Sequence, residues 1–313
     1  TLSGRPMLAF LIERLRMCSL VNEIILATTN TPADDCLEEL GCSVGIKVFR
    51  GSEHDVLDRF ASAASLSDSS VFVRITGDCP LSDPTLIDSA IETFCRERVD
   101  FLSNASPPTF PDGLDIEIFT REALTLANTN CNSVSQREHV TSWMYESDSL
   151  SKLFLKYDQD LSSYRWTVDE PEDLEVIRSV ASHFSDNIFF DWNQVLELNR
   201  TQPQLFSANA GFIRNDGESI CNGQKLWSRA KRVIPGGNML LSKRPELYLP
   251  KYWPSYFSKS KGCTVWDLDS REFTDMSIMG IGTNILGYGH PEVDASVLET
   301  VTSGNMSTLN CPE

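Results

Sequence analysis

The sequence predicts an α/β fold whose sheet is mostly parallel and covered by helices on both faces. Short apolar runs rich in β-branched residues alternate with segments of helical periodicity up to about residue 205. This alternation is typical of parallel strands joined by crossover helices. The 313 residues exceed the roughly 100 to 200 residues of one domain, so a second domain is expected.

The expected elements of the first domain follow one another in a regular order. Asp83 is a favourable N-cap and Pro84 a favourable first residue for one helix, and Gly41 is expected to end another. The expected strands cover residues 23–28, 44–49, 70–75, 101–102, 114–119, 153–157 and 165–168. The expected helices cover residues 6–18, 32–40, 54–65, 84–96, 133–145 and 171–183. Strands joined by helices in this way predict a Rossmann-like sheet.

A small, polar and aperiodic stretch marks the expected domain boundary. We expect a first domain of residues 1–207, a linker of residues 208–222 and a second segment of residues 223–313. In that segment, residues 224–233 are expected to form a helix. The runs 264–267 and 272–275 flank residues 269–271, which predicts a β-hairpin.

Composition and charge exclude several classes of protein. The net charge of -17 argues against a nucleic-acid partner. No apolar run approaches the roughly 20 residues of a membrane helix. The nine cysteines are scattered and form no C-x-x-C pair, which argues against a zinc site or a disulfide framework and favours the cytoplasm. The chain begins at Thr1 and ends without a closing element, so we expect a fragment of a longer protein.

Polar residues follow three of the expected strands. Thr28 ends the first strand, Gly77 and Asp78 follow the third, and Asp169 follows the run 165–168. Ligands of open parallel sheets bind beyond the carboxyl ends of the strands, and two converging carboxylates suit Mg²⁺ with substrate phosphates. Alternatively, Asp78 is an ordinary turn residue and Asp169 a favourable acidic residue at a helix entrance.

Five blocks in the first domain resemble the cytidylyltransferases of spore-coat polysaccharide synthesis, which are relatives of the enzymes that activate deoxy-octulosonate and sialic acids with CTP. The resemblance covers about residues 1–205. The blocks are residues 51–59 (GSEHDVLDR), 74–84 (RITGDCPLSDP), 110–117 (FPDGLDIE), 137–141 (REHVT) and 165–174 (RWTVDEPEDL).

The resemblance implies a role for each matching residue. It implies a sheet of the nucleotide-diphospho-sugar transferase type, with Asp78 and Asp169 as catalytic Mg²⁺ ligands. The nucleotide would be bound by Thr28, Gly51, Ser52, Arg59 and Gly77. The acceptor sugar would be bound by Asp112, Asp115 and Glu117, with Arg137 and His139 as catalytic residues beside them. The family also has a first strand and a glycine- and basic-rich phosphate loop, which would precede residue 1.

Each of the acceptor-side residues also has a structural interpretation. His139 could be a packed or surface histidine. Arg137 could pair with Glu138 or Glu146 on a solvated helix. Asp115 and Glu117 alternate with isoleucines, so they could mark the solvent face of a strand.

The second segment resembles the opening of class III aminotransferases, and most closely the glutamate-1-semialdehyde aminomutases. The matching blocks are residues 226–237, 261–269, 273–275 and 280–291. Gly280-x-Gly282 lacks the third glycine of a dinucleotide loop. The resemblance implies pyridoxal phosphate (PLP) as cofactor, with its lysine and acidic partner in a part of the family fold beyond residue 313. Lys259 and Lys261 are interpreted as solvated charges.

The leading hypothesis is a cytidylyltransferase joined to an aminotransferase, both serving the synthesis of surface glycans. A sugar or sugar-acid hydroxyl would attack the α-phosphorus of CTP, and a homodimer is expected. In a second hypothesis the aminotransferase is the principal activity and the first domain binds a nucleotide sugar. A third is a remnant without enzymatic activity.

Overall fold

The computed structural model describes residues 1–131, 133–185, 187–212, 222–249, 253–277 and 282–304. The chain divides into two compact units, Thr1–Arg214 and Asn215–Glu313. The division lies inside the stretch expected to be the linker. We describe the two units separately.

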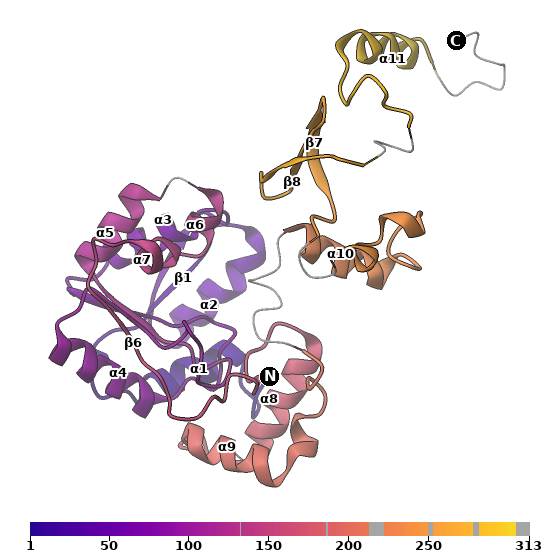
Figure 1. Ribbon diagram of the computed structural model, residues 1–313. Coiled ribbons are helices and arrows are strands. Elements are labelled where there is room, and N and C mark those ends of the chain that lie inside the picture. Colours follow the sequence, from indigo (N-terminus) through magenta and orange to yellow (C-terminus); the bar gives the residue numbers. More distant parts are fainter. Residues whose placement is uncertain (132, 186, 213–221, 250–252, 278–281, 305–313) are drawn as a thin grey trace. The chain divides into compact units, whose positions relative to one another are not determined.

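Unit 1 is an α/β structure with helices on both faces of its strands (Figure 1). Its strands are β1 (Ile25–Thr29), β2 (Lys47–Gly51), β3 (Val71–Arg74), β4 (Phe101–Ser103), β5 (Glu117–Thr120) and β6 (Lys152–Phe154). Its helices are α1 (Met7–Leu15), α2 (Asp35–Ser43), α3 (Val56–Ala64), α4 (Pro84–Glu97), α5 (Arg121–Asn130), α6 (Val134–Glu138), α7 (Ser142–Glu146), α8 (Pro171–His183) and α9 (Trp192–Thr201). Helices α5 and α9 are additional to those expected from the sequence.

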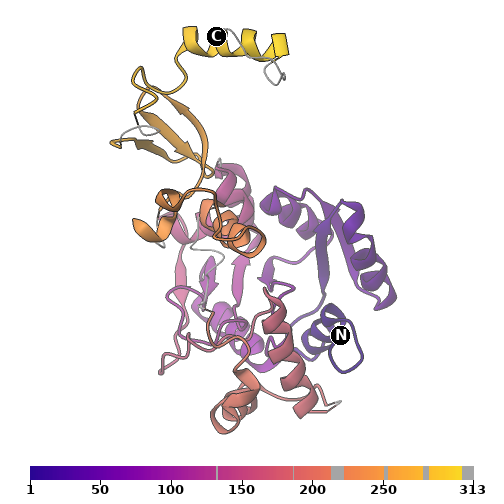
Figure 2. The same ribbon diagram turned by 90° about the vertical axis from the view of Figure 1, so that its right-hand side faces the viewer.

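The strands form two sheets, which Figure 2 shows from the side. Strand β1 pairs with β2 in parallel. The second sheet has the order β3-β5-β4-β6, in which β4 and β6 are parallel and β5 is antiparallel to both of its neighbours. The expectation of a mostly parallel sheet is therefore wrong at β5. The link from β4 to β5 contains no helix, and without a crossover helix the chain returns in the opposite direction.

The side chains of the second sheet alternate between two apolar layers. Phe101 and Phe119 are fully buried in the layer that contains α3, α5 and α7. Leu102 and Ile118 are fully buried in the layer that contains α4. A third apolar cluster joins α1, α8 and α9 around Trp166. Helices on both faces, as predicted, thus exclude water from β4 and β5.

Three local expectations are corrected by backbone geometry. Helix α2 continues past Gly41, where a Cβ atom would lie 2.5 Å from Val48 Cγ2, so this glycine permits close packing rather than ending the helix. The expected helix 133–145 is broken into α6 and α7, and Val140 between them has a φ of +51°. Residues 165–168 form no strand, since Arg165 makes only an isolated bridge to Asp112.

The start of the strand expected over residues 114–119 is replaced by a side-chain interaction. The buried Asn104 amide donates to the Leu114 carbonyl (2.8 Å) and its oxygen accepts from the Ile116 N–H (2.7 Å). The side chain thus satisfies two backbone groups that a neighbouring strand would otherwise pair. The regular ladder of β5 consequently begins only at Glu117.

Unit 2 contains α10 (Asn222–Val233), a small antiparallel sheet and α11 (Pro291–Gly304). The sheet has the order β7 (Phe257–Lys261), β8 (Thr264–Asp267) and β9 (Glu272–Thr274), which confirms the predicted hairpin. Buried Asp267 stabilises its turn by accepting from the N–H groups of Asp269 and Arg271. Residues 280 and 281 of the glycine-rich run lie outside the described residues. None of the helices in the described ranges has the length and apolar character of a membrane span.

Candidate functional site

The turns that carry Asp78 and Asp169 lie side by side. The backbone N–H of Val168 donates to the carbonyl of Asp78 (2.8 Å), and Thr167 Oγ1 donates to the same oxygen (3.4 Å). The pKa of Asp169 is raised, first by partial burial and further by the negative charge of Asp78. Hydrogen bonds to one carbonyl therefore hold together two turns that are about 90 residues apart in sequence, each of which carries an aspartate.

The Arg165 side chain links the Asp169 carboxylate to the buried carboxylate of Asp173. Its Nη2 donates to Asp169 Oδ2 (2.6 Å), while Nε and Nη2 donate to the two carboxylate oxygens of Asp173 (2.9 and 2.8 Å). Asp173 is fully buried, whereas the Asp169 side chain is 52% exposed. Asp173 thus fixes the guanidinium, and the guanidinium orients a carboxylate that still faces solvent.

The entrance to α8 supports this arrangement. Glu170 is the N-cap, and it forms a capping box with Asp173. The pKa of Asp173 is below its ordinary value: burial alone would raise it, but hydrogen bonds from Arg165 and Asn209 outweigh that effect. Asp169 precedes the cap, so the helix-entrance interpretation and the metal-ligand interpretation are compatible at this position.

Asp112 is held against the same network. It is buried, and Arg165 Nη1 approaches its Oδ2 at 3.3 Å. Its carbonyl accepts from the N–H of Trp166 (2.7 Å). The following residue, Gly113, has a φ of +100°, and a Cβ there would lie 2.6 Å from the carbonyl carbon of Trp166. The close contact of these two loops therefore requires glycine.

Glu117 is a buried acceptor at the centre of a polar cluster. Its side chain is 7% exposed and pairs with Arg74 Nη1 (2.5 Å). Its other oxygen accepts from Thr141 Oγ1 (2.7 Å) and Tyr145 Oη (2.9 Å). The solvent-face interpretation is therefore wrong for Glu117. Asp115 is half-buried, and its charge contributes to the raised pKa of Cys79 after burial and Asp78.

Arg137 packs against α3 and α5. Its Nε pairs with Asp55 (2.6 Å), and Nη1 donates to the carbonyls of Asn128 (3.2 Å) and Cys131 (3.1 Å). The pairing with Glu138 or Glu146 considered from the sequence is replaced by Asp55, which is also the N-cap of α3. His139 follows in the break between α6 and α7 and is half-buried.

Of the residues expected to bind the nucleotide, Thr28, Gly51 and Ser52 lie at or just after the carboxyl ends of β1 and β2, and Arg59 lies on α3. Thr28 Oγ1 donates to Asp34 (2.8 Å), and the next residue of β1 pairs with Gly51 in the parallel register. Arg59 Nη1 donates to the Ser52 carbonyl (2.8 Å). A Cβ at Gly51 would lie 2.9 Å from the Arg59 side chain. The expected residues are thus brought together as one polar group.

Several residues of these clusters received no role from the sequence. Hydrogen bonds first from Thr29 and then from Thr28 lower the pKa of Asp34. Arg165 lies four residues before Asp169 and eight before Asp173, and this spacing is the signal that could have identified it. Asp34 lies six residues after Thr28, in the segment that follows β1. Three others contact Glu117 from segments that are distant in sequence, and no such signal marked them: Arg74, Thr141 and Tyr145.

Unit 1 has the fold of the α/β nucleotidyltransferases, and it carries polar groups at the carboxyl ends of its strands. The solved structure of a cytidylyltransferase from Leptospira borgpetersenii serovar Hardjo-bovis matches with a TM-score of 0.64 and 32% identity, over 66% of this chain and 87% of that one. The family model described as cytidylyltransferase matches residues 1–189, and the chain belongs to this family.

Two curated proteins extend the comparison. An uncharacterized protein of Methanocaldococcus jannaschii is 37% identical over 212 residues, which cover 67% of this chain and 86% of that protein. The spore coat polysaccharide biosynthesis protein SpsF of Bacillus subtilis is 29% identical over 187 residues, which cover 57% of this chain and 77% of that protein. The similarity to cytidylyltransferases stated from the sequence blocks is confirmed.

The C-terminal segment is similar to parts of aminotransferases. Glutamate-1-semialdehyde 2,1-aminomutase of Albidiferax ferrireducens is 37% identical over 83 residues. That match covers 26% of this chain and 18% of the aminomutase, so the chain spans less than a fifth of that protein. The similarity is confirmed as a local one.

Proposed function

We propose that unit 1 transfers CMP from CTP to a sugar or sugar acid in the synthesis of a surface polysaccharide. The observation that carries the proposal is the hydrogen bond from Val168 to Asp78, because it brings two carboxylate-bearing turns to one place. Membership of the cytidylyltransferase family supports CTP as the donor. The similarity to a spore-coat polysaccharide protein supports the pathway class.

Asp78 and Asp169 fit a Mg²⁺ ion. The described residues hold no group of three or more histidine, cysteine, aspartate or glutamate side chains that could bind a metal. Mg²⁺ characteristically uses one or two carboxylates and completes its shell with water and substrate phosphates, so a pair is sufficient. When bound, the ion would neutralise charge on the phosphates. The hydrogen bond from Arg165 leaves the Asp169 carboxylate facing solvent, from which Mg²⁺ would bind.

The remaining residues are proposed to bind the two substrates. Thr28, Gly51, Ser52 and Arg59 would contact the nucleotide, and Gly77 would leave room for it because no atom lies within 4 Å of a Cβ built there. Asp115 would face the acceptor, with Asp112, Glu117, Arg137 and His139 positioned around it. The acceptor hydroxyl oxygen would bond to the α-phosphorus as the bond to pyrophosphate breaks.

The metal site is tested by calorimetric titration of CTP and Mg²⁺ into the longest natural form of the chain. Asp78→Ala and Asp169→Asn are expected to weaken Mg²⁺-dependent CTP binding at least about tenfold, or about 1.4 kcal/mol. Asp169→Asn can still accept the hydrogen bond from Arg165, so its effect reports the lost charge. Exposed Glu172→Gln is the matched control. Wild-type affinity in Asp78→Ala would remove this residue from the site.

The local similarity to an aminomutase favours a second activity for the longer protein. We propose that residues 223–313 belong to a PLP-dependent aminotransferase. We assign no lysine to the cofactor: Lys259 Nζ lies 4.4 Å from the centre of the Trp266 ring, where it makes a cation–π contact on the sheet of unit 2. PLP absorbance without pyrophosphate release from CTP and any sugar acid would instead favour the aminotransferase as the principal activity.

A further inference from the structure

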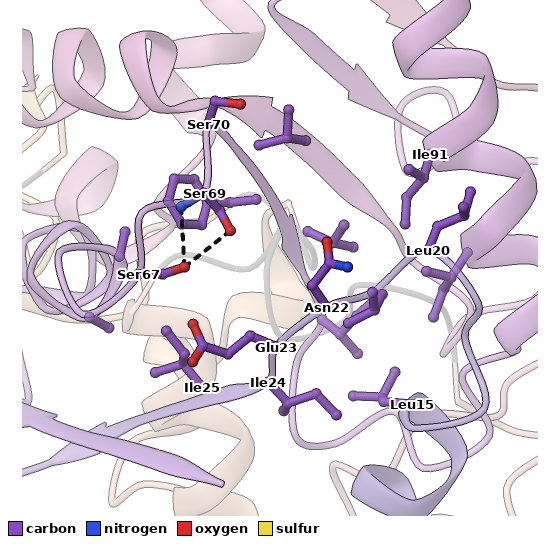
Figure 3. A pocket seen from close by; sticks show the side chains of 18 of the residues that line it. Leu15, Leu20, Asn22, Glu23, Ile24, Ile25, Ser67, Ser69, Ser70 and Ile91 are labelled. Carbon is purple, nitrogen blue, oxygen red and sulfur yellow. Dashed lines mark hydrogen bonds between the residues drawn. The ribbon is translucent and has the colours of Figure 1, made fainter.

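The network of Arg165, Asp169 and Asp173 is completed by residues near the C-terminal end of unit 1. A cavity of about 550 Å³ lies between β1 and β3 (Figure 3). None of the described residues that line it belongs to the network. The further partners of the network include Asn209 and Phe212, which follow α9. The orientation of Asp169 therefore depends on this last part of unit 1 and not on the cavity.

Asn209 is a buried polar residue in an otherwise exposed turn. It is 3% exposed, whereas the residues on either side of it are exposed. A short 3₁₀ helix, Pro203–Phe206, leads into the turn, and Phe206 is buried in the third apolar cluster of unit 1. The N–H of Phe212 donates to the Asn209 carbonyl (3.0 Å) and closes the turn. Because burial of an amide without partners is costly, the contacts of the Asn209 side chain are decisive.

The Asn209 amide contacts both members of the buried ion pair. Its Nδ2 donates to Asp173 Oδ1 (2.8 Å), the oxygen that also accepts from Arg165 Nε (2.9 Å). The same Nδ2 donates to the backbone carbonyl of Arg165 (3.1 Å). An amide NH₂ group carries two hydrogens, so both bonds form at once. Asn209 therefore fixes Arg165 at its backbone and, through Asp173, at its guanidinium.

Phe212 covers the same guanidinium. Arg165 Cζ lies 5.7 Å from the centre of the Phe212 ring, within the range of a cation–π contact. The Arg165 side chain is 8% exposed, while the Asp169 side chain to which it donates is 52% exposed. The turn thus contacts the buried end of the network, and Asp169 remains accessible at the other end.

We propose that Asn209 is a positioning residue for the candidate Mg²⁺ ligand Asp169, on which it acts through Asp173 and Arg165. The inference rests on the proposed function, because it requires Asp169 to be a ligand. If the guanidinium lost its fixed position, the carboxylate would have to be ordered when the ion binds, at a cost in free energy. Residues that orient metal ligands characteristically change metal affinity by about 10- to 100-fold. Asn209 acts through two further residues, so we expect the lower end of this range.

The position of Asn209 in the chain gives the inference a wider meaning. The match to the cytidylyltransferase family model ends at residue 189, and unit 1 ends at Arg214. Asn209 and Phe212 lie between these two points. The last described residues of unit 1, which lead toward the second segment of the chain, therefore contribute to the surroundings of the candidate metal site.

Calorimetric titration of the longest natural form of the chain tests the inference. Asn209→Ala is expected to raise the dissociation constant for Mg²⁺ in the presence of CTP about tenfold. The dissociation constant for CTP in EDTA should not change. A residue that only stabilised the fold would alter neither constant well below the unfolding temperature. Asn193→Ala, which changes an exposed asparagine on α9, is the matched control.

A double-mutant cycle shows whether Asn209 acts through Asp169. In the Asp169→Asn background, Asn209→Ala should raise the Mg²⁺ dissociation constant by less than about twofold, because the orienting effect is already lost. Equal effects in the two backgrounds overturn the inference. Wild-type Mg²⁺ affinity in Asn209→Ala overturns it as well and leaves the proposed function intact. Wild-type affinity in Asp169→Asn removes Asp169 from the proposed metal site, and the inference fails with it.

A measurement without metal or nucleotide examines the contact itself. The Arg165 Nε–H group donates to buried Asp173, so its hydrogen should exchange slowly with water in ¹⁵N NMR spectra. In Asn209→Ala this exchange should be at least about tenfold faster, and an unchanged rate overturns the inference. If Asn209→Ala fails to fold, Asn209→Ser replaces it. One hydroxyl hydrogen can serve only one of the two acceptors, so the Mg²⁺ dissociation constant should rise about threefold, and wild-type affinity overturns the inference.

Discussion

Replacing Asp173 with asparagine tests how the buried Arg165 network stabilises unit 1. Asparagine offers a single acceptor oxygen, and its amide would face N–H donors. Removing one partner of a buried ion pair costs about 3 to 5 kcal/mol, so the midpoint of thermal unfolding should fall by about 6 to 20 °C for a domain of this size. In the wild type, the fully buried Asp173 carboxylate accepts hydrogen bonds from the side chains of Arg165 (2.9 and 2.8 Å) and Asn209 (2.8 Å). It also accepts from the backbone N–H groups of Asp169 (3.1 Å) and Glu170 (3.0 Å).

The pH dependence of the same variant gives the reasoning a second test. The pKa of Asp173 is lower in the folded protein than its ordinary value of about 3.9. Its stabilising contribution is therefore complete above the unfolded-state pKa and is lost as the pH falls through the folded-state pKa. The difference in unfolding temperature between wild type and variant should accordingly be largest near neutral pH and shrink below about pH 4.

Thermal unfolding of the full chain, followed by tryptophan fluorescence, measures both effects. The control is Glu172→Gln, which changes a neighbouring exposed carboxylate on the same helix and should leave the midpoint within about 2 °C. A midpoint for Asp173→Asn that matches this control would refute the role of the network. A large difference that is the same at every pH would refute the assignment of the titrating group.

Three further outcomes follow from packing. Gly113→Ala should cost more than about 3 kcal/mol in urea unfolding, since the new methyl group would clash with the Trp166 backbone at a φ of +100°; a cost under 1 kcal/mol would be inconsistent with the close contact. Asn104→Leu should cost about 2 to 4 kcal/mol, because two buried backbone groups lose their partner; unchanged stability would show that water replaces the amide. Burial raises the pKa of Cys79, so iodoacetamide should alkylate it far more slowly than exposed Cys36 in the native chain.

Much of unit 1 was predictable because its signals are local. The N-cap Asp83 accepts from the Leu86 N–H (2.8 Å), and Pro84 begins α4 as expected. The antiparallel direction of β5 was not predictable from its own residues, because direction depends on the connection rather than on the strand. Gly41 shows a related limit: a glycine required for packing and a glycine that ends a helix look alike in sequence.

Some residues of the candidate site could likewise be predicted from the sequence, and others could not. Residues at strand ends, such as Thr28 and Asp78, were identifiable because the end of an apolar run is visible in sequence. The partners of Arg137 and Glu117 were not, since Asp55 and Arg74 come from segments about 40 to 80 residues away and meet them only after the helices pack. The sequence identified the candidate carboxylate residues, but it did not show which of them would form ion pairs with arginine in the folded chain.

The buried Arg14 side chain bears on the order in which unit 1 can assemble. Its guanidinium donates to the carbonyls of Ser82, Ile188 and Phe190 and lies over the Phe190 ring. Two of these acceptors are more than 170 residues further along the chain. A ribosome therefore releases α1 long before its partners exist, and a cation cannot be buried without acceptors at low cost. Helix α1 is therefore expected to be among the last helices of unit 1 to dock.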